Sequence, residues 1–207
     1  MFITFEGLDF CGKSTQVQLL GEYLIEEKKK IKILREPGGT PISEKIREIL
    51  LNKENTEISM ETELILFAAS RSQLVNQVII PALNENYYVI SDRFHDSSIA
   101  YQSFGRKIPL AFVEEFQQFV IGKAIPDITI FLDIPIKEVI RRKSMIKKTD
   151  LDRIESSNID FYERVREGYL YLSEREKRII KIDGTLTISE IHKKIVNEII
   201  KYEIGKD

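Results

Sequence analysis

Residues 7–14, GLDFCGKS, have the residue types and spacing of a phosphate-binding loop, G-x-x-x-x-G-K-[ST]. The segment follows a strand-like run, FITFE, and precedes a helix-like pattern, which is the context that this loop requires. Its glycines let backbone N–H groups turn toward phosphate oxygens, Lys13 would reach the β and γ phosphates, and Ser14 would bind Mg²⁺. The alternative is a chance match in a glycine-containing turn. The predicted nucleotide-binding residues are Gly7, Leu8, Asp9, Phe10, Cys11, Gly12, Lys13, Ser14 and Thr15.

Three kinds of protein use such a loop: GTPases, ATPase motors and small-molecule kinases. GTPases usually recognise guanine through Asn-Lys-x-Asp, and the nearest match, residues 52–55 with the sequence NKEN, lacks the final Asp. Motors normally add domains to a larger core, whereas 207 residues fit one domain that would span residues 1–207. A kinase that phosphorylates a small acceptor therefore fits best.

Phe67 and Arg71 have the types and spacing to recognise a nucleobase. They stand four residues apart in a predicted helix over 59–78, so they share one face of it. The Phe67 ring could stack on a base, and the planar Arg71 guanidinium could donate to base carbonyl oxygens. Taken alone, the pair could equally be a core phenylalanine next to an arginine whose aliphatic stem is buried.

A second group of polar residues strengthens the interpretation of an acceptor site. Asp92 and Arg93 follow the strand-like run YYVIS, and the carboxyl ends of parallel strands are where α/β proteins bind ligands. Ser98, Tyr101 and Gln102 stand at i, i+3 and i+4, so a helix would direct their hydroxyl and amide groups toward one place. Together these residues suit a nucleoside monophosphate.

Short β-rich runs alternate with longer helical patterns through the chain, which predicts an α/β fold. We expect a P-loop NTPase fold, with a five-stranded parallel sheet sandwiched by helices. Arg35 and Glu36 close the second strand-like run and would lie at the same sheet edge as Asp92. The predicted strands are Phe2–Glu6, Ile31–Arg35, Tyr87–Ser91, Ile128–Asp133 and Arg178–Ile182.

Helix starts are also visible in the sequence. Thr40 before Pro41 predicts an N-cap and a first helical residue, and Thr187 with Glu190 predicts a capping box. The pattern breaks at residues 143–157, which are strongly charged. That segment is either a solvated loop or a functional lid.

Composition excludes several classes of protein. The chain is 43% hydrophobic and 31% charged with a net charge of −2, so no overall positive field exists to attract nucleic acid. Cys11 is the one cysteine, which excludes an internal disulfide and suggests a reducing compartment. No stretch in the sequence approaches the length of a membrane span. We therefore expect a cytoplasmic protein without a nucleic-acid or membrane partner.

Six segments, the last of which ends at residue 155, resemble the bacterial thymidylate kinases in order and approximate spacing. They are FEGLDFCGKSTQ, REPGGTPISEKIREILL, LFAASRSQ, DRFHDSSIAYQ, PDITIFLDIP and LDRIE. The resemblance implies a homodimeric enzyme that phosphorylates dTMP to dTDP in dTTP synthesis, with ATP as donor, Mg²⁺ as cofactor and a mobile lid at about 141–153.

The resemblance also implies a role for each matching residue. Asp9 would hold the sugar 3′-hydroxyl, Arg93 and Arg47 the acceptor phosphate, and Tyr101 would favour deoxyribose. Phe67 would stack on thymine, while Arg71, Ser98 and Gln102 would bind its polar edge. Glu36 would be a further acidic contact near the sugar or the metal. The implied metal site comprises Ser14, Asp92 and Glu36, and the implied catalytic residues are Lys13, Asp9, Arg93, Arg153 and Arg141.

The chain departs from the family pattern at two places. Phe10 and Cys11 stand where many relatives carry Gly-Ala or Gly-Ser. Without an arginine in the loop, the cation of the transition state should come from the lid, where Arg141, Arg142 and Arg153 are the candidates. The alternatives to this function are another P-loop phosphotransferase and a non-catalytic nucleotide-binding protein.

Overall fold

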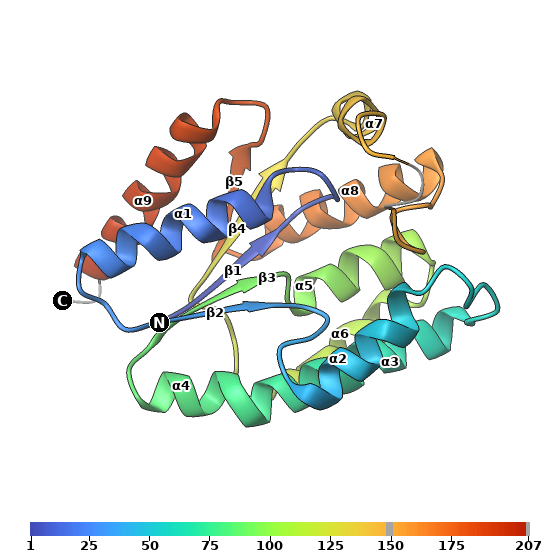
Figure 1. Ribbon diagram of the computed structural model, residues 1–207, viewed down its shortest axis with the longest axis horizontal. Coiled ribbons are helices and arrows are strands. Elements are labelled where there is room, and N and C mark those ends of the chain that lie inside the picture. Colours follow the sequence, from blue (N-terminus) through green and yellow to red (C-terminus); the bar gives the residue numbers. More distant parts are fainter. Residues whose placement is uncertain (148–150, 206–207) are drawn as a thin grey trace.

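Five parallel strands form a sheet at the centre of the part of the chain that the computed structural model describes, residues 1–147 and 151–205 (Figure 1). The strand order is β2-β3-β1-β4-β5, so the first strand lies in the middle of the sheet. The strands are β1 Phe2–Glu6, β2 Ile31–Arg35, β3 Tyr88–Asp92, β4 Ile128–Asp133 and β5 Ile179–Asp183. The predicted parallel α/β sheet is confirmed, although β3 and β5 each begin and end one residue later than predicted.

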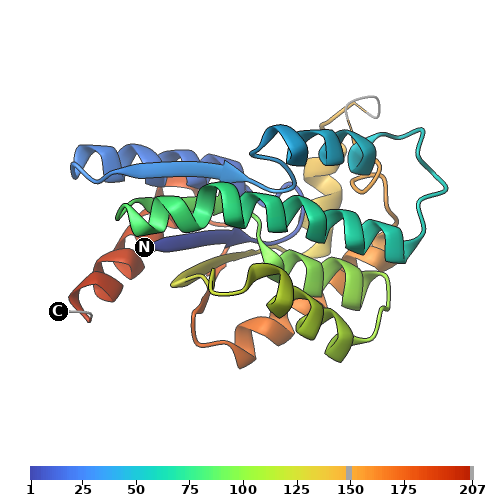
Figure 2. The same cartoon turned by 90° about the horizontal axis from the view of Figure 1, so that it is seen from below.

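Helices connect the strands and cover both faces of the sheet (Figures 1 and 2). None in the described part of the chain is long and apolar enough to cross a bilayer. The α-helices are α1 Lys13–Glu26, α2 Pro41–Leu51, α3 Met60–Leu74, α4 Ile80–Asn84, α5 His95–Ser98, α6 Leu110–Ile121, α7 Ile136–Lys143, α8 Ile159–Arg175 and α9 Ile188–Ile204. Two segments form wider π-type turns, η1 Val75–Ile79 and η2 Ile99–Gly105.

The central strand β1 is buried on both faces. Successive strand residues point to opposite faces, so Phe2 packs in a cluster with Leu74, whereas Ile3 and Phe5 pack in a cluster with Leu20 of α1. A strand covered on both sides by helices has little need of polar residues, and every residue of β1 is buried. This packing fixes the carboxyl end of β1, where the phosphate-binding loop starts.

Side-chain caps begin several helices, and those of Thr40 and Thr187 are the ones that the sequence predicted. Thr40 and Ser59 each accept a hydrogen bond from an amide three residues on, at 3.1 Å and 3.2 Å. Thr187 and Glu190 form the full capping box at the start of α9. These caps satisfy N–H groups that have no partner within the helix.

The helix predicted over residues 59–78 extends further than its sequence pattern indicated. It begins at Met60, passes through the π-type turn Val75–Ile79 and continues as α4 to Asn84. The wide turn lies directly before Pro81, which has no N–H for the helical ladder and crowds the preceding turn. A widened turn lets the chain remain helical across the proline, which simple helical periodicity does not predict.

Candidate active site

A cavity of about 540 Å³ opens where the strands end, beside the glycine-rich loop. It is the meeting place of most of the residues that the sequence singled out. Those lining it are Asp9, Phe10, Gly12, Lys13, Ser14, Thr15, Glu36, Arg47, Phe67, Arg71, Asp92, Arg93, Ser98, Tyr101 and Gln102. Of the other predicted site residues, Gly7, Leu8, Cys11, Arg141 and Arg153 are not among the described residues that line it.

The glycine-rich loop has a backbone that ordinary residues adopt at a cost. Gly7 has a φ of 137°, and a Cβ there would lie 2.6 Å from the carbonyl oxygen of Leu132 in β4. Gly12 has a φ of 100° and precedes the first residue of α1. Phe10 also adopts a positive φ, 67°, although it is not a glycine. The turn is therefore maintained in this chain despite the strain of a left-handed phenylalanine.

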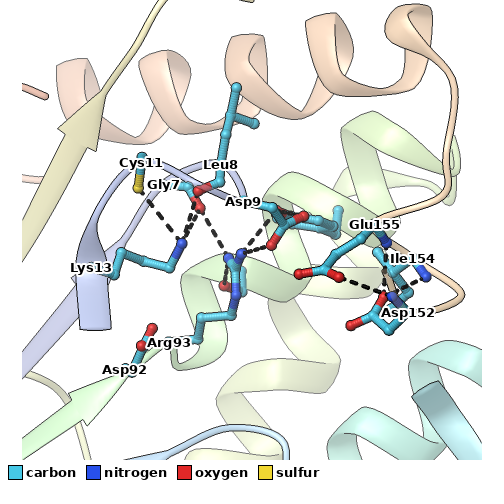
Figure 3. A network of polar contacts seen from close by, with 12 residues as sticks. Gly7, Leu8, Asp9, Cys11, Lys13, Asp92, Arg93, Asp152, Ile154 and Glu155 are labelled. Carbon is cyan, nitrogen blue, oxygen red and sulfur yellow. Dashed lines mark hydrogen bonds and ion pairs between the residues drawn. The ribbon is translucent and has the colours of Figure 1, made fainter. Parts of the chain in front are cut away.

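The Lys13 ammonium lies inside this loop (Figure 3). Its Nζ donates to the carbonyl oxygens of Gly7 at 3.2 Å and Leu8 at 2.8 Å, and it lies 3.6 Å from the Cys11 sulfur. The side chain is buried at the start of α1, where backbone N–H groups and the helix dipole favour anions. A fixed cation and free amide donors are thus concentrated at one point.

Ser14 and Asp92 place two oxygen-bearing side chains next to Lys13. The Ser14 hydroxyl donates to an Asp92 carboxylate oxygen at 2.6 Å, which brings the start of α1 to the end of β3. Mg²⁺ prefers hard oxygen ligands and is usually held by one or two protein groups together with phosphates and water. Together with phosphate oxygens and water, such a pair could hold a Mg²⁺ ion.

An ion pair between Asp9 and Arg93 lies between the loop and the rest of the cavity (Figure 3). The two side chains approach to 2.5 Å, and Arg93 also donates to the Tyr101 hydroxyl at 3.0 Å. Tyr101 and Tyr162 donate to the other Asp9 oxygen at 3.0 Å and 3.1 Å. Burial raises the pKa of Asp9, but Arg93 and Lys13 outweigh it and hold that pKa below its ordinary value. Asp9 is therefore an anion that orients Arg93.

Glu6, at the end of β1, bonds two hydroxyl groups that also contact Arg93. Arg93 donates to Ser97 at 3.2 Å and to Tyr169 at 3.1 Å. Both hydroxyls bond a Glu6 carboxylate oxygen, at 2.6 Å and 2.8 Å. Burial, with the charge of nearby Asp96, raises the pKa of Glu6 to about 7. Arg93 itself has a φ of 71°, so these contacts hold a strained residue in place.

Arg71 is a fully buried cation held by several partners. It forms an ion pair with Glu36 at 2.7 Å and donates to Ser98 at 2.8 Å and to Gln117 at 2.5 Å. Phe67, four residues earlier, lines the same cavity. The Glu36 carboxylate, implied to be a sugar or metal contact, thus bonds Arg71 through one oxygen, and its other oxygen is buried without a described partner. Burial raises the pKa of Glu36, against the opposing charge of Arg71.

Two further arginines flank the segment that follows β2. Arg47 and Arg35 both donate to the carbonyl oxygen of Pro37, at 2.9 Å and 3.2 Å, and both line the cavity. Burial, followed by the charge of Arg35, lowers the pKa of Arg47 below its ordinary value. From the sequence, Arg47 was expected to bind an acceptor phosphate, and Arg35 was expected only at the same sheet edge, among the groups that suit a monophosphate.

Asp152 and Glu155 also line the cavity, and the sequence analysis gave them no role. An Asp152 oxygen accepts from the backbone N–H groups of Ile154 and Glu155, each at 2.8 Å (Figure 3). Burial raises the pKa of both carboxyl groups, and the charge of Asp9 adds to the rise. Their only sequence signal was a pair of acids in the LDRIE segment.

The three arginines of the predicted lid are not among the described residues that line the cavity. Arg153 forms an ion pair with Glu63 at 2.8 Å, and Arg141 pairs with Glu138 on its own helix at 2.6 Å. Arg142 donates to the carbonyl oxygens of Phe10 and Gly184, each at 3.0 Å. Arg142 therefore joins the glycine-rich loop to the loop after β5. Within the predicted lid, residues 148–150 lie outside the described part of the chain.

A phosphate-binding loop between β1 and α1, at the carboxyl edge of a parallel sheet, defines a nucleotide-binding enzyme of the P-loop NTPase fold. The cavity with its cations extends from that loop, as a phosphoryl-transfer enzyme requires. The family model described as "Thymidylate kinase" matches residues 5–195. The chain belongs to the thymidylate kinase family.

Individual relatives agree along almost the whole chain. A thymidylate kinase of Kosmotoga olearia is 47% identical over 201 residues, covering 97% of this chain and 95% of the relative. One of Chlorobaculum tepidum is 47% identical over 207 residues, covering 96% of each chain. Among solved structures, a thymidylate kinase from Ehrlichia chaffeensis has a TM-score of 0.78 at 32% identity and covers 96% of this chain and 97% of its own.

Proposed function

We propose that this chain phosphorylates dTMP to dTDP on the route to dTTP, with ATP as the phosphoryl donor and Mg²⁺ as the metal. Family membership supports the reaction and the acceptor. The observation that carries the proposal here is a single cavity that joins the phosphate-binding loop to Phe67 and Arg71. One end suits a triphosphate, and the other suits a base.

Electrostatics sets the main requirement of this reaction. A phosphate monoester has a second pKa near 6, so the acceptor is mostly a dianion at neutral pH and needs no general base. The difficulty is repulsion between the donor and acceptor phosphates. Each pair of like unit charges about 5 Å apart costs roughly 3 kcal/mol at an effective dielectric constant near 20. Fixed cations along the cavity offset this repulsion.

On the donor side, Lys13 and the amides at the start of α1 would bind the ATP phosphates. Ser14 and Asp92 would hold Mg²⁺, which when bound neutralises charge on the phosphate oxygens. Arg142 lies where the glycine-rich loop meets the loop after β5, so we assign it to the nucleotide end of the cavity.

On the acceptor side, Arg93 and Arg47 would bind the phosphate of dTMP. Asp9 would orient Arg93 and accept from the sugar 3′-hydroxyl. Tyr101 lies against this pair, where its ring would occupy the space of a 2′-hydroxyl. These groups would act by positioning and by neutralising charge, which is how phosphoryl-transfer enzymes lower the barrier.

The base would lie between Phe67 and the polar groups of Arg71, Ser98 and Gln102. Phe67 would stack on thymine, and Arg71 would donate to a carbonyl oxygen. Closure of the segment 141–153 would exclude water and deliver a cation from Arg141, Arg142 or Arg153 to the transferring group.

We also propose that two copies form a homodimer, as the family resemblance implied. Figure 2 shows α2, α3 and α6 side by side on one side of the molecule. Large apolar side chains on these helices are exposed, among them Ile49, Ile65 and Phe119, which is 83% exposed. A second copy would cover them, and sedimentation analysis should give twice the monomer mass.

A coupled assay that offers dTMP, dUMP, dCMP, dAMP and thymidine tests the proposed reaction. We expect ADP formation with dTMP to exceed that with each other acceptor. A higher rate with thymidine or a purine monophosphate would indicate another phosphotransferase. Binding of ATP without turnover on any acceptor would indicate a non-catalytic nucleotide-binding protein.

A further inference from the structure

Glu63 of α3 is a buried carboxylate outside the cavity lining, and four contacts surround it. Arg106 donates to both of its oxygens, each at 3.1 Å, and Arg153 forms an ion pair with it at 2.8 Å. Its remaining described partner is Gln102, whose side-chain nitrogen Nε2 donates to it at 3.1 Å. The two arginines and the buried position leave the carboxylate little freedom to move.

The charge state of Glu63 decides how Gln102 must be oriented. Burial raises the pKa of Glu63, but the hydrogen bonds and charge of Arg106 outweigh it and lower that pKa below its ordinary value. An ionised carboxylate only accepts hydrogen bonds. The Gln102 amide therefore has to present its nitrogen to Glu63, since its oxygen would face a second oxygen.

The other polar atom of the Gln102 amide is its side-chain oxygen. Gln102 lines the cavity, and its bond to Glu63 uses the side-chain nitrogen. A carboxamide has its oxygen and nitrogen on opposite sides, so fixing the nitrogen fixes the oxygen as well. With its nitrogen bonded to Glu63, Gln102 has its oxygen left as a hydrogen-bond acceptor for the cavity.

We infer that Glu63 is a positioning residue for base specificity: it locks the Gln102 amide with the oxygen toward the base, so that the site selects a base edge with an N–H donor. The inference rests on the proposed function, because it assumes that a nucleobase occupies the end of the cavity near Phe67 and Arg71.

The chemistry of the pyrimidines agrees with this polarity. Arg71 has only donors and requires a carbonyl oxygen, whereas Gln102 as fixed by Glu63 requires an N–H group. Thymine and uracil in a nucleotide carry a carbonyl at C4 next to N3–H. Cytosine carries an amino group at C4 next to an unprotonated N3, which is the reverse pattern. Cytosine would therefore face Arg71 and Gln102 with unmatched groups on both sides.

The test is the ratio of kcat/KM for dTMP to kcat/KM for dCMP in Glu63→Gln and Glu63→Asp. The amide introduced by Glu63→Gln could donate to Gln102 or accept from it, so Gln102 would no longer be locked, and the ratio should fall at least about tenfold. The carboxylate retained in Glu63→Asp still only accepts, so the ratio of this variant should stay within about threefold of the wild type even where both rates decrease. Glu61→Gln, at an exposed position on the same helix, is the control and should change the ratio by less than about twofold.

Each outcome bears on one conclusion. An unchanged ratio in folded Glu63→Gln, or a collapsed ratio in Glu63→Asp, would overturn the inference while leaving the proposed reaction intact. If the loss of charge beside Arg106 and Arg153 unfolds Glu63→Gln, as its thermal melt would reveal, the Glu63→Asp ratio decides. Absence of dTMP turnover in the wild type would instead refute the proposed function.

Discussion

An Asp9 carboxylate oxygen lies 2.5 Å from the Arg93 guanidinium, and the two side chains are only 14% and 16% exposed. The pair links the glycine-rich loop to the residue that follows β3, so one contact fixes these two segments against each other. Its low exposure means that neither charge is well solvated alone.

Removal of one member of this pair should cost more than removal of both. Arg93→Met leaves the buried Asp9 charge uncompensated, and we expect a loss of about 3–5 kcal/mol in the free energy of unfolding. The double variant Asp9→Asn with Arg93→Met should recover much of this loss. Urea unfolding of the two single variants and the double variant measures the coupling, and additive losses would contradict it.

Lys13→Ala should reduce kcat by about 10²-fold or more, because a fixed cation that stabilises transferring charge is typically worth that much. The assay is steady-state kinetics with dTMP at saturation. Lys45→Ala, at an exposed position on α2, is the matched control. A variant that retains more than about a tenth of the wild-type kcat would remove Lys13 from the catalytic residues.

Arg71→Lys should raise the KM for dTMP by about tenfold or more and leave the KM for ATP nearly unchanged. Lysine keeps a positive charge near Glu36 but loses the planar set of donors that Arg71 uses to bind Glu36, Ser98 and Gln117. Equal increases in both KM values would indicate a structural role for Arg71.

Arg142→Ala should weaken the binding of ATP more than that of dTMP. Because Arg142 donates to the carbonyl oxygens of Phe10 and Gly184, its loss should loosen the nucleotide end of the cavity. We expect the KM for ATP to increase by about tenfold, with a smaller effect on the KM for dTMP. The reverse order of effects would place Arg142 at the acceptor instead.

Glu6 predicts a specific pH dependence of stability. Its pKa is raised from 4.5 to about 7 in the folded protein, so folding favours the protonated form. The stabilisation from this group is complete below the unfolded pKa of 4.5 and is lost as the pH rises through about 7. The total is on the order of 3 kcal/mol. In Glu6→Gln, the part of the free energy of unfolding that depends on the titration of Glu6 should be absent. Urea unfolding from about pH 5 to about pH 8 measures it. Parallel profiles for the two proteins would contradict the assigned shift.

Local sequence signals predicted the strands and the glycine-rich loop because each depends on neighbouring residues. FITFE, the two glycines of the loop and Ser14 all lie within residues 2–14. Both ends of three of the five strands were predicted correctly. Capping of α9 by Thr187 and Glu190 is equally local. Such features can be derived from hydrophobic alternation, turn chemistry and capping.

The remaining features depend on contacts between distant segments. The Glu36–Arg71 pair joins residues 35 positions apart, and the partnership of Gln102 with Glu63 spans 39 positions. Asp152 and Glu155 line the same cavity as Phe67 and Arg71 although they are far from them in the sequence, which no periodicity indicates. One sequence without its fold does not indicate which acid meets which arginine.

A crystal structure of the complex with dTMP and a non-hydrolysable ATP analogue would test the central claim most directly. We expect the thymine ring on Phe67, its C4 carbonyl on Arg71, the monophosphate on Arg93, and the analogue's terminal phosphate beside Lys13. A monophosphate bound away from Arg93, with Arg71 contacting only protein groups, would contradict it.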